Sequence, residues 1–292
     1  MRRVAVVVVH FGAPGPTVAC IATLRADPSQ VERRVVVVDN SGGLDPATLG
    51  TEVAVVTAAG NLGFGAGVNL GVEALGSVSW DALVVLNHDV EVRPGFLSAA
   101  VEAVSVPGIG AASGPLFLDS ERRRLWYAGG GVDFLTGTVR QSRRLRDVGR
   151  ERDVSFLPGA AIVFAWKAFH GAGGFDPRFF LYHEDLDICM RLRRQGWRLR
   201  FVPALEAVHR LGAATGSDQL SPLYLESLSR TRLRAFRPLA YRLYLAVLHS
   251  GYVAVRAGTF ALLGGRRGRE RAIALLRGHR AALAGILSSP TE

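Results

Sequence analysis

The chain has 292 residues, of which 49% are hydrophobic and 21% charged. This composition is that of a folded globular protein and excludes an intrinsically disordered one. The length fits one large domain, or one domain with a helical extension. The formal net charge of +10 predicts an anionic partner, such as a phosphorylated substrate, an acidic lipid or nucleic acid. The only cysteines, Cys20 and Cys189, have no partner spacing, which excludes a zinc site and a disulfide framework and favours a reduced, cytoplasmic protein.

The first hundred residues alternate between strand-like and helix-like segments. Buried β-branched runs predict strands, and periodic segments between them predict helices. The predicted strands are 4–9, 34–38, 53–56 and 82–86, and the predicted helices are 17–26, 65–75 and one that follows Pro94. Runs of this kind are typical of parallel strands covered on both faces, so we expect an α/β fold.

The second half of the chain is less uniform. Residues 111–165 are rich in arginine and glycine, and we expect hairpins and a substrate-side loop there. Apolar positions at helical spacing predict a helix around 186–190 that ends at Gly196, followed by a strand at 197–202. The pattern is helical from about residue 217 onward, so we divide the chain into a main domain at 1–216 and a basic, amphipathic helical region at 217–292.

Polar side chains follow three of the predicted strands. Asp39, Asn61 and Asp89 each come just after a strand-like run. Ligands of open α/β sheets bind outside the carboxyl ends of the strands, so this pattern predicts a nucleotide site. Aspartate and asparagine also end strands for reasons of turn chemistry, and that interpretation stays open at this point.

The segment Asn87-His88-Asp89 places a carboxylate directly after a buried strand. Such a group can hold Mg²⁺ or Mn²⁺, which neutralises a diphosphate as it leaves. The alternative is an aspartate that begins a turn. His209 is a candidate second metal ligand, although a single histidine is more often structural.

The segment Glu184-Asp185-Leu186-Asp187 begins the predicted helix around 186–190. Acids in a first turn interact favourably with the helix dipole, and Asp187 is spaced to pair with Arg191. Three acids in four positions exceed what that role needs. Because neighbouring carboxylates raise one another's pKa, Asp185 is our candidate general base, with Glu184 beside it.

The segment from Gly60 to Asn69 contains four glycines before a predicted helix. Glycines permit close backbone approach, and free N–H groups at a helix start can bind phosphate or ribose oxygens. The segment matches neither a Walker loop nor a dinucleotide fingerprint placed after the first strand. By itself it is a weak indication of a phosphate site.

Together these segments resemble the family 2 glycosyltransferases, in particular the bacterial rhamnosyltransferase-like branch with a GT-A fold. The resemblance covers residues 4–216 and rests on segments that occur in the same order. They are VVVVHFG, VVVVDNSGG, GNLGFGAGVNLG, VVLNHDVEVRPG, LPGAAIVF, GGFDPRFFLYHEDLDICMRLRRQGW and the segment around His209. The resemblance implies a Rossmann-like nucleotide-binding sheet with helices on both faces, here extended by C-terminal helices.

The same resemblance implies an activity and a set of site residues. The activity is inverting, Mg²⁺- or Mn²⁺-dependent transfer of a sugar from a nucleotide-diphosphate sugar, dTDP-rhamnose or a UDP-hexose, to an acceptor hydroxyl in glycan, cell-envelope or natural-product synthesis. The implied nucleotide-sugar site contains His10, Phe11, Asp39, Asn61, Gly63, Phe64, Gly65, Asn69, Asn87, His88 and Asp89. The implied metal ligands are Asp89 and His209, the implied catalytic acids are Asp185 and Glu184, and the residues facing the donor sugar or acceptor are Gly159, Ala160 and His183.

Two positions depart from the family pattern. Asn87 replaces the first acid of a strict DxD element, which predicts weaker metal binding. His88 stands where proline is common, which predicts a differently shaped loop.

The tail from 239 to 265 is apolar except for a narrow stripe of Arg242, His249 and Arg256, seven residues apart. One interpretation is a helix lying in the membrane plane, which would make the protein peripheral on the inner face of the cell membrane through residues 230–280 and bring it to a lipid-linked acceptor. The other is a helix packed on the main domain with its stripe facing outward. Both stay open at this point.

Three other classes of protein fit the sequence less well than a glycosyltransferase. A sugar nucleotidyltransferase would carry a glycine-rich loop after the first strand, where this chain has His10-Phe11-Gly12-Ala13-Pro14. A nucleic-acid-binding module would interleave aromatic residues with a basic strand face, and no such pattern is present. A non-catalytic nucleotide-sugar-binding relative would lack the acids that stand at positions 89 and 185.

Overall fold

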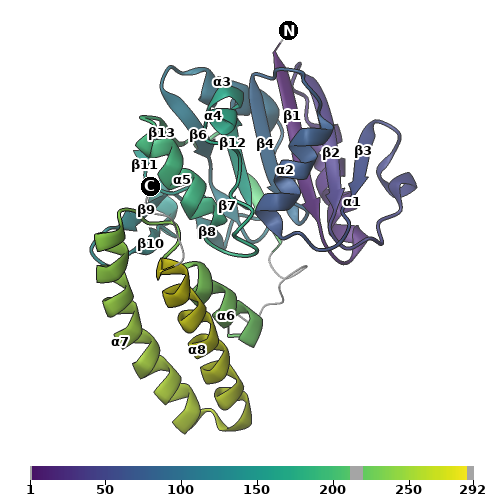
Figure 1. Ribbon diagram of the computed structural model, residues 1–292. Helices are drawn as coiled ribbons and strands as arrows, with labels where there is room; N and C mark the ends of the chain where they lie inside the picture. The colour runs from purple at the N-terminus through teal and green to yellow at the C-terminus, as the bar shows by residue number, and fades with distance from the viewer. Residues whose placement is uncertain (1, 211–219, 288–292) are drawn as a thin grey trace.

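A computed structural model describes residues 2–210 and 220–287 (Figure 1). Eight strands form a central sheet in the order β11-β13-β6-β12-β4-β1-β2-β3. Their bounds are β1 Arg3–His10, β2 Glu32–Asp39, β3 Val53–Thr57, β4 Ala82–Asn87, β6 Ile109–Ser113, β11 Arg152–Val154, β12 Ala161–Ala165 and β13 Arg198–Phe201. The predicted strands of the first hundred residues are all present.

The centre of the sheet is a continuous apolar layer. Strand β1 lies between β2 and β4, parallel to both, and Val4 to Val8 are completely buried. A strand covered on both faces needs apolar side chains at successive positions, which explains its run of valines. The register places His10 opposite Asp39, and Val9 opposite Asn87, so the polar ends of three strands meet at one edge.

The other half of the sheet is mixed rather than wholly parallel. Strand β12 runs antiparallel to both β4 and β6, and β11 runs antiparallel to β13. Because β12 is antiparallel to β4, its first residues lie beside the last residues of β4. The segment 159–161 therefore joins the same edge of the sheet as His10 and Asn87.

Helices cover both faces of the sheet (Figure 1). They are α1 Pro14–Ala26, α2 Phe64–Ala74, α3 Phe96–Ser105, α4 Trp166–Gly171 and α5 Glu184–Arg194, with short 3-10 turns η1 Pro46–Leu49 and η2 Leu145–Asp147. Helix α2 approaches the sheet closely at Gly71, where an added Cβ would lie 2.5 Å from a methyl group of Val7. Helix α5 ends at Arg194, and Gly196, the residue that the sequence predicts as the stop, follows in a left-handed conformation.

A second, smaller sheet lies at the same edge of the molecule. It has the order β5-β14-β7-β8, and the hairpin β9-β10 lies beside it in the sequence. The bounds are β5 Val90–Val92, β7 Leu116–Phe117, β8 Leu125–Tyr127, β9 Gly130–Asp133, β10 Thr138–Gln141 and β14 Ala207–His209. The pairing of β14 with β5 places His209 opposite Val90, next to Asp89.

Three helices form the C-terminal part: α6 Pro222–Thr231, α7 Leu239–Leu263 and α8 Gly265–Leu287. Helices α7 and α8 form an antiparallel hairpin that extends away from the sheet, with α6 alongside α8 (Figure 1). The predicted domain boundary at 216/217 lies outside the described residues. Helix α7 is long and apolar enough to cross a membrane, judged by length and composition only, and 28% of its most apolar window is buried.

The polar stripe of α7 points into the C-terminal helices. His249 is 5% exposed, and a guanidinium nitrogen of Arg242 donates to the carbonyl of Gly285 in α8 at 3.0 Å. The guanidinium of Arg256 lies over the rings of Tyr252 and Phe260. Arg242 and His249 therefore turn toward α8, against the interpretation in which the stripe faces outward, whereas Arg256 packs on rings of its own helix.

Candidate functional site

Two buried histidines lie where β1 and β4 end. The rings of His10 and His88 meet edge to face, with centroids 5.6 Å apart, and both residues are almost completely buried. His10 is held by Thr17, whose hydroxyl lies 2.6 Å from Nδ1. Burial lowers the pKa of both histidines, which keeps them neutral at pH 7. Nε2 of each ring is buried without a hydrogen-bond partner among the described residues, and Nε2 of His10 lies 4.0 Å from Oδ1 of Asp39.

Asp39 organises the loop that follows β2. Its carboxylate accepts hydrogen bonds from the backbone of Ser41, Gly42 and Leu44 and from the Ser41 hydroxyl. Burial acts to raise the pKa of Asp39, but these four bonds outweigh it and the pKa is lowered. With 1% exposure, Asp39 acts through the loop 41–44 that it shapes, while the neighbouring Phe11 is 36% exposed at the same edge.

The glycine-rich segment is packed against another loop rather than left open. Gly63 has a φ of +80°, and an added Cβ would lie 2.0 Å from the carbonyl oxygen of Phe180. A Cβ on Gly65 would lie 2.9 Å from the side chain of Phe175. Asn61 completes the turn by accepting a hydrogen bond from the Gly63 N–H. These glycines therefore serve close contact with the loop 175–183.

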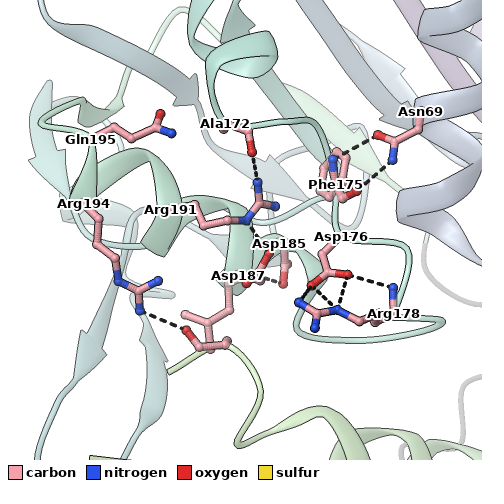
Figure 2. Close-up of polar contacts among 12 residues, drawn as sticks. Asn69, Ala172, Phe175, Asp176, Arg178, Asp185, Asp187, Arg191, Arg194 and Gln195 are labelled. Atoms are coloured by element: carbon pink, nitrogen blue, oxygen red, sulfur yellow. Dashed lines mark hydrogen bonds and ion pairs between the residues drawn. The ribbon is translucent and has the colours of Figure 1, made fainter. Parts of the chain in front are cut away.

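Asn69 fastens α2 to that same loop. Its amide nitrogen donates to the Phe175 carbonyl at 2.7 Å, and its amide oxygen accepts from the Phe175 N–H at 3.0 Å (Figure 2). The two bonds use the amide in both directions, so Asn69 shapes the site by holding the backbone at Phe175.

Asp89 and His209 face each other between β4 and β14. Nε2 of His209 lies 3.2 Å from Oδ1 of Asp89, and both side chains are about 95% buried. Burial acts to raise the pKa of Asp89, but the His209 ring outweighs it and the pKa is lowered, so the carboxylate is charged at pH 7. The backbone N–H of Arg210 donates to the Asp89 carbonyl and fixes the two segments together.

The donor set fits a divalent cation at this position. The two candidate ligand atoms are Oδ1 of Asp89 and Nε2 of His209, and Oδ1 of Asp89 is buried without an aligned hydrogen-bond partner among the described residues. Two neighbouring ligands of an octahedral Mg²⁺ or Mn²⁺ are about 3 Å apart, given bonds of about 2.1 Å. The separation of 3.2 Å between Asp89 and His209 matches that value. No group of three or more candidate ligands occurs within residues 2–210 and 220–287, so water and substrate oxygens would complete the shell.

The acidic helix α5 begins at a strained turn. Tyr182 and His183 both have φ of +67°, a left-handed conformation that costs a residue with a side chain about 1 kcal/mol or more. Contacts with α6 maintain this turn: Nδ1 of His183 lies 2.9 Å from the Thr231 hydroxyl, and the Tyr182 ring packs on Tyr224. Burial and the nearby Arg232 lower the pKa of His183 to about 3, so it is neutral. His183 thus faces the C-terminal helices.

Asp185 is the accessible carboxylate of α5. One oxygen accepts from the Gly159 N–H at 3.1 Å and the other from the Leu186 N–H at 2.8 Å. An added Cβ on Gly159 would lie 3.5 Å from Cβ of Asp185 and 3.1 Å from the ring of Phe64, so these three residues meet. Burial raises the pKa of Asp185 to about 6, against the effect of the backbone hydrogen bonds. It is therefore mostly charged at pH 7 and can accept a proton.

Glu184 occupies a more enclosed position than Asp185. It is 8% exposed, and its Oε2 has no hydrogen-bond partner among the described residues. Burial first, and the charge of Asp185 second, raise the pKa of Glu184 to about 8. Glu184 is therefore mostly protonated at pH 7, next to a charged Asp185.

Asp187 belongs to the support of α5. Its carboxylate accepts from Nε of Arg191 at 2.7 Å, and the same guanidinium donates to the carbonyl of Ala172 (Figure 2). The predicted pairing four residues apart is confirmed. Asp176 on the neighbouring loop pairs with Arg178 in the same way, through three side-chain hydrogen bonds.

The two acidic clusters are joined through the start of β12. The Asn87 N–H donates to the carbonyl of Ala160 at 2.9 Å, and the adjoining Gly159 holds Asp185. Asp89, two residues beyond Asn87, and Asp185 therefore flank one short backbone segment. The charged Asp185 and the Asp89–His209 pair therefore lie at the same edge of the sheet.

Sequence reasoning missed several residues of this site. The Trp126 ring packs edge to face on His209 with centroids 4.9 Å apart, and Thr17 holds His10. Thr231 contacts the residue before the acidic helix. Each lies far along the chain from its partner or on another element, and no local pattern marks such contacts.

Comparison with known families and proteins gives consistent matches. The family model described as glycosyl transferase family group 2 matches residues 82–259. The chain is 31% identical over 243 residues to the N-acetylglucosaminyl-diphospho-decaprenol L-rhamnosyltransferase of Mycobacterium tuberculosis H37Rv, covering 75% of this chain and 78% of the relative. It is 32% identical over 78 residues to the rhamnosyltransferase WbbL of Escherichia coli K12, covering 27% and 30%.

Solved structures share the fold at low sequence identity. The mannosyltransferase PcManGT of Pyrobaculum calidifontis, in complex with GDP-Man and Mn²⁺, has a TM-score of 0.58 and 14% identity over 99% of this chain and 88% of its own. TarS 1–349 of S. aureus has a TM-score of 0.59 and 14% identity over 98% and 82%. Both likenesses extend beyond the sheet and include the C-terminal helices.

Proposed function

The chain belongs to glycosyl transferase family group 2, has the GT-A fold and is a glycosyltransferase, and from this premise we propose that it is an inverting enzyme acting on a nucleotide-diphosphate sugar. The observation that carries the proposal is the position of Asp185. A charged carboxylate with a pKa raised to about 6 meets Gly159 and Phe64 at the carboxyl edge of the sheet. A general base works best with a pKa near the working pH.

In the proposed reaction Asp185 removes the proton from an acceptor hydroxyl. That oxygen attacks the anomeric carbon of the donor sugar from the side opposite the diphosphate, and the bond from this carbon to the diphosphate oxygen breaks. The N–H of Gly159 keeps the Asp185 carboxylate oriented during proton transfer. Glu184, whose pKa is raised by burial and by the charge of Asp185, would stay protonated beside the base.

Asp89 and His209 would hold Mg²⁺ or Mn²⁺. Bound there, the cation would neutralise the negative charge that develops on the leaving diphosphate. The neutral rings of His10 and His88 face the same edge and would donate or accept hydrogen bonds to the nucleotide part of the donor. Phe11, Asn61 and the loop 41–44 would border the base and ribose.

The nature of the relatives supports a choice of substrates. The relative from M. tuberculosis is named for L-rhamnosyl transfer to a diphospho-decaprenol-linked sugar. We therefore propose dTDP-rhamnose as the donor, ahead of UDP-hexoses, and a lipid-linked glycan as the acceptor. Residues 1–216 would form the catalytic domain, and the helical region 217–292 would place the enzyme on the cytoplasmic side of the cell membrane.

Replacing the base tests this proposal. Asp185→Asn should lower kcat by about 10²–10⁴-fold, the usual contribution of a general base, while donor binding changes little. Turnover would be followed by release of the nucleoside diphosphate from dTDP-rhamnose with a lipid-linked acceptor, and donor binding by calorimetry. Asp153→Asn, on the outer strand β11, is the matched control with unchanged turnover expected. A folded Asp185→Asn enzyme with near-normal kcat would rule out Asp185 as the base.

A further inference from the structure

Helix α7 exposes an apolar face. Charged residues are absent from its exposed positions, all of which belong to the described part of the chain. The large apolar side chains on this face are Leu239, Leu243, Tyr244, Val247, Leu248, Tyr252, Val255, Leu262 and Leu263. Val247 and Val255 are 74% and 73% exposed, which is unusual for valines two helical turns apart on a charged protein.

The polar groups of α7 lie on its opposite face. Arg242 donates to α8, and the ring of His249 packs on the ring of His279 in α8 with centroids 5.0 Å apart. Helix α7 also packs on α8 through Val253, Ala257 and Leu275. An amphipathic helix on the surface of a water-soluble protein exposes its arginines to solvent and buries its valines against the core. The face that α7 presents therefore suits a non-aqueous environment.

The surroundings of this face are strongly basic. Residues 232–287 contain eleven arginines and one acid, Glu270, and this charge of +10 equals the net charge of the whole chain. In the rest of the protein, the numbers of basic and acidic side chains are equal. At the tip of the hairpin, Leu262 and Leu263 are 85% and 83% exposed, and two glycines separate them from Arg266 and Arg267. Apolar side chains flanked by arginines are typical of a helix that binds an anionic lipid surface.

We propose that the exposed face of α7 and the tip of the α7–α8 hairpin dock on an anionic lipid surface, with α7 lying in its plane. The charge argues for lipid over a second copy of this chain, because the α7–α8 hairpin carries eight arginines and one acid, and two such hairpins would repel each other. It also argues against insertion across the bilayer, since α8 packs along α7 and carries six arginines that hydrocarbon would not accommodate.

Docking would set the position of the catalytic base. Helix α6 packs along α8, and its Thr231 contacts His183, the residue directly before α5. The strained turn that aims Glu184 and Asp185 therefore rests on helices attached to the docked hairpin. This step relies on the proposed function, whereas lipid binding itself does not.

Vesicle binding by the full chain tests the proposal. The wild-type protein should co-sediment with phosphatidylcholine vesicles that contain phosphatidylglycerol, and much less with phosphatidylcholine alone. The double variant Val247→Glu/Val255→Glu should bind the anionic vesicles at least about tenfold more weakly, because it places two charges on the apolar face. Leu145→Glu, a substitution of a 58% exposed leucine in η2, is the matched control and should bind normally.

A second pair of variants tests the electrostatic part. Arg266→Glu/Arg267→Glu should weaken binding to anionic vesicles, whereas Arg143→Glu/Arg146→Glu, the same charge change on the catalytic side, should not. Circular dichroism and thermal melting establish that each variant is folded. Binding of the donor in the absence of vesicles is measured in parallel by calorimetry. A protein that does not bind the donor would contradict the proposed function, whereas vesicle binding alone tests docking.

Two results would overturn docking. The first is equal vesicle binding by the wild type and the Val247→Glu/Val255→Glu variant. The second is a wild-type dimer in light scattering that these substitutions convert to a monomer while vesicle binding stays unchanged, which would make the face an interface between copies.

Discussion

Glu184 and Asp185 are adjacent acids with different environments. Asp185 keeps hydrogen bonds from Gly159 and Leu186, which favour its charged form, while Glu184 is enclosed and lacks a partner for Oε2 within the described residues. The result is a pKa of about 6 for Asp185 and about 8 for Glu184. Burial raises the pKa of both acids, and the backbone hydrogen bonds to Asp185 oppose that rise, which supports the proposal that Asp185 is the base.

This difference makes stability depend on pH through Glu184. Its pKa is about 8 in the folded state against an ordinary value of 4.5. The folded state therefore holds a proton that the unfolded state releases, and the stability gained in this way is complete below pH 4.5 and lost as pH rises through 8. Glu184→Gln cannot ionise, so at pH 9 it should be more stable than the wild type by on the order of 2 kcal/mol, with little difference at pH 5. Thermal melting across this range measures the effect.

The exposed Glu102→Gln variant is the control for that experiment, and its melting temperature should follow the wild type at each pH. If the melting temperature of Glu184→Gln also equals that of the wild type at pH 9, ionising Glu184 does not destabilise the folded protein. That result would contradict a raised pKa for Glu184.

The pair of Asp89 and His209 predicts a response to metal removal. EDTA should abolish turnover, and Mg²⁺ or Mn²⁺ should restore it, because the leaving diphosphate needs charge neutralisation. Asp89→Asn should raise the metal concentration needed for half-maximal rate by about tenfold or more. Titration of Mn²⁺ by electron paramagnetic resonance gives a second readout. Glu91→Gln, which loses only the pair with Arg210, should keep wild-type metal affinity, and full activity in EDTA would contradict a metal role.

At the scale of elements, the glycine-rich start of α2 and the loop before α5 form one unit. Gly63 and Gly65 contact Phe180 and Phe175, and Asn69 bonds the backbone of Phe175 in both directions. The conformation of the loop that leads to the catalytic helix is thus set by α2. A side chain at Gly63 would push on the loop at Phe180 and disturb the position of Asp185.

Gly63→Ala tests this unit. The new Cβ would lie 2.0 Å from the Phe180 carbonyl oxygen at a φ of +80°, so we expect a loss of about 2 kcal/mol or more in the free energy of unfolding. Turnover should fall as well. Gly60→Ala, where an added Cβ meets nothing within 4 Å, should change stability by less than about 1 kcal/mol. Chemical denaturation measures both, and equal stability of the two variants would contradict the close contact at Gly63.

At the scale of the whole molecule, the C-terminal helices share the core of the catalytic part. Phe236 and Leu245 belong to the main apolar cluster together with residues of the central sheet. An added Cβ on Gly137, in the β9–β10 turn, would lie 2.9 Å from Leu245 and 3.4 Å from Phe236. The start of α7 is therefore integrated with the hairpin β9-β10, while its far end projects outward (Figure 1).

A shared core predicts cooperative unfolding. Calorimetry of the wild-type protein should show one transition, and Phe236→Ala should lower the stability of the whole protein by about 3–5 kcal/mol, because the ring is completely buried. Phe134→Ala, at a 45% exposed position of the same turn region, should cost less than about 1.5 kcal/mol. A separate low-temperature transition that alone responds to Phe236→Ala would mean that the C-terminal helices unfold independently.

Local pattern was sufficient for the elements and their order. The valine runs predicted β1 and β2, and the spacing of Leu186, Cys189 and Met190 predicted α5 with its end at Gly196, because a buried strand or helix face imposes its period on the sequence. Asp89 and Asp185 could be singled out for the same reason, since strand ends and helix starts are visible locally. The pairing of Asp187 with Arg191 also follows from spacing within one helix.

Only the tertiary structure decided what each polar group faces. Asp39 and Asn69 satisfy backbone groups of neighbouring loops, His183 turns toward α6, and the stripe of α7 turns inward. The same carboxylate or imidazole can serve a ligand or a loop, and the choice depends on partners far away in the chain. The sequence alone determined which segments place acids and histidines at the ends of strands and helices, whereas packing determined which of those groups already bond to the protein.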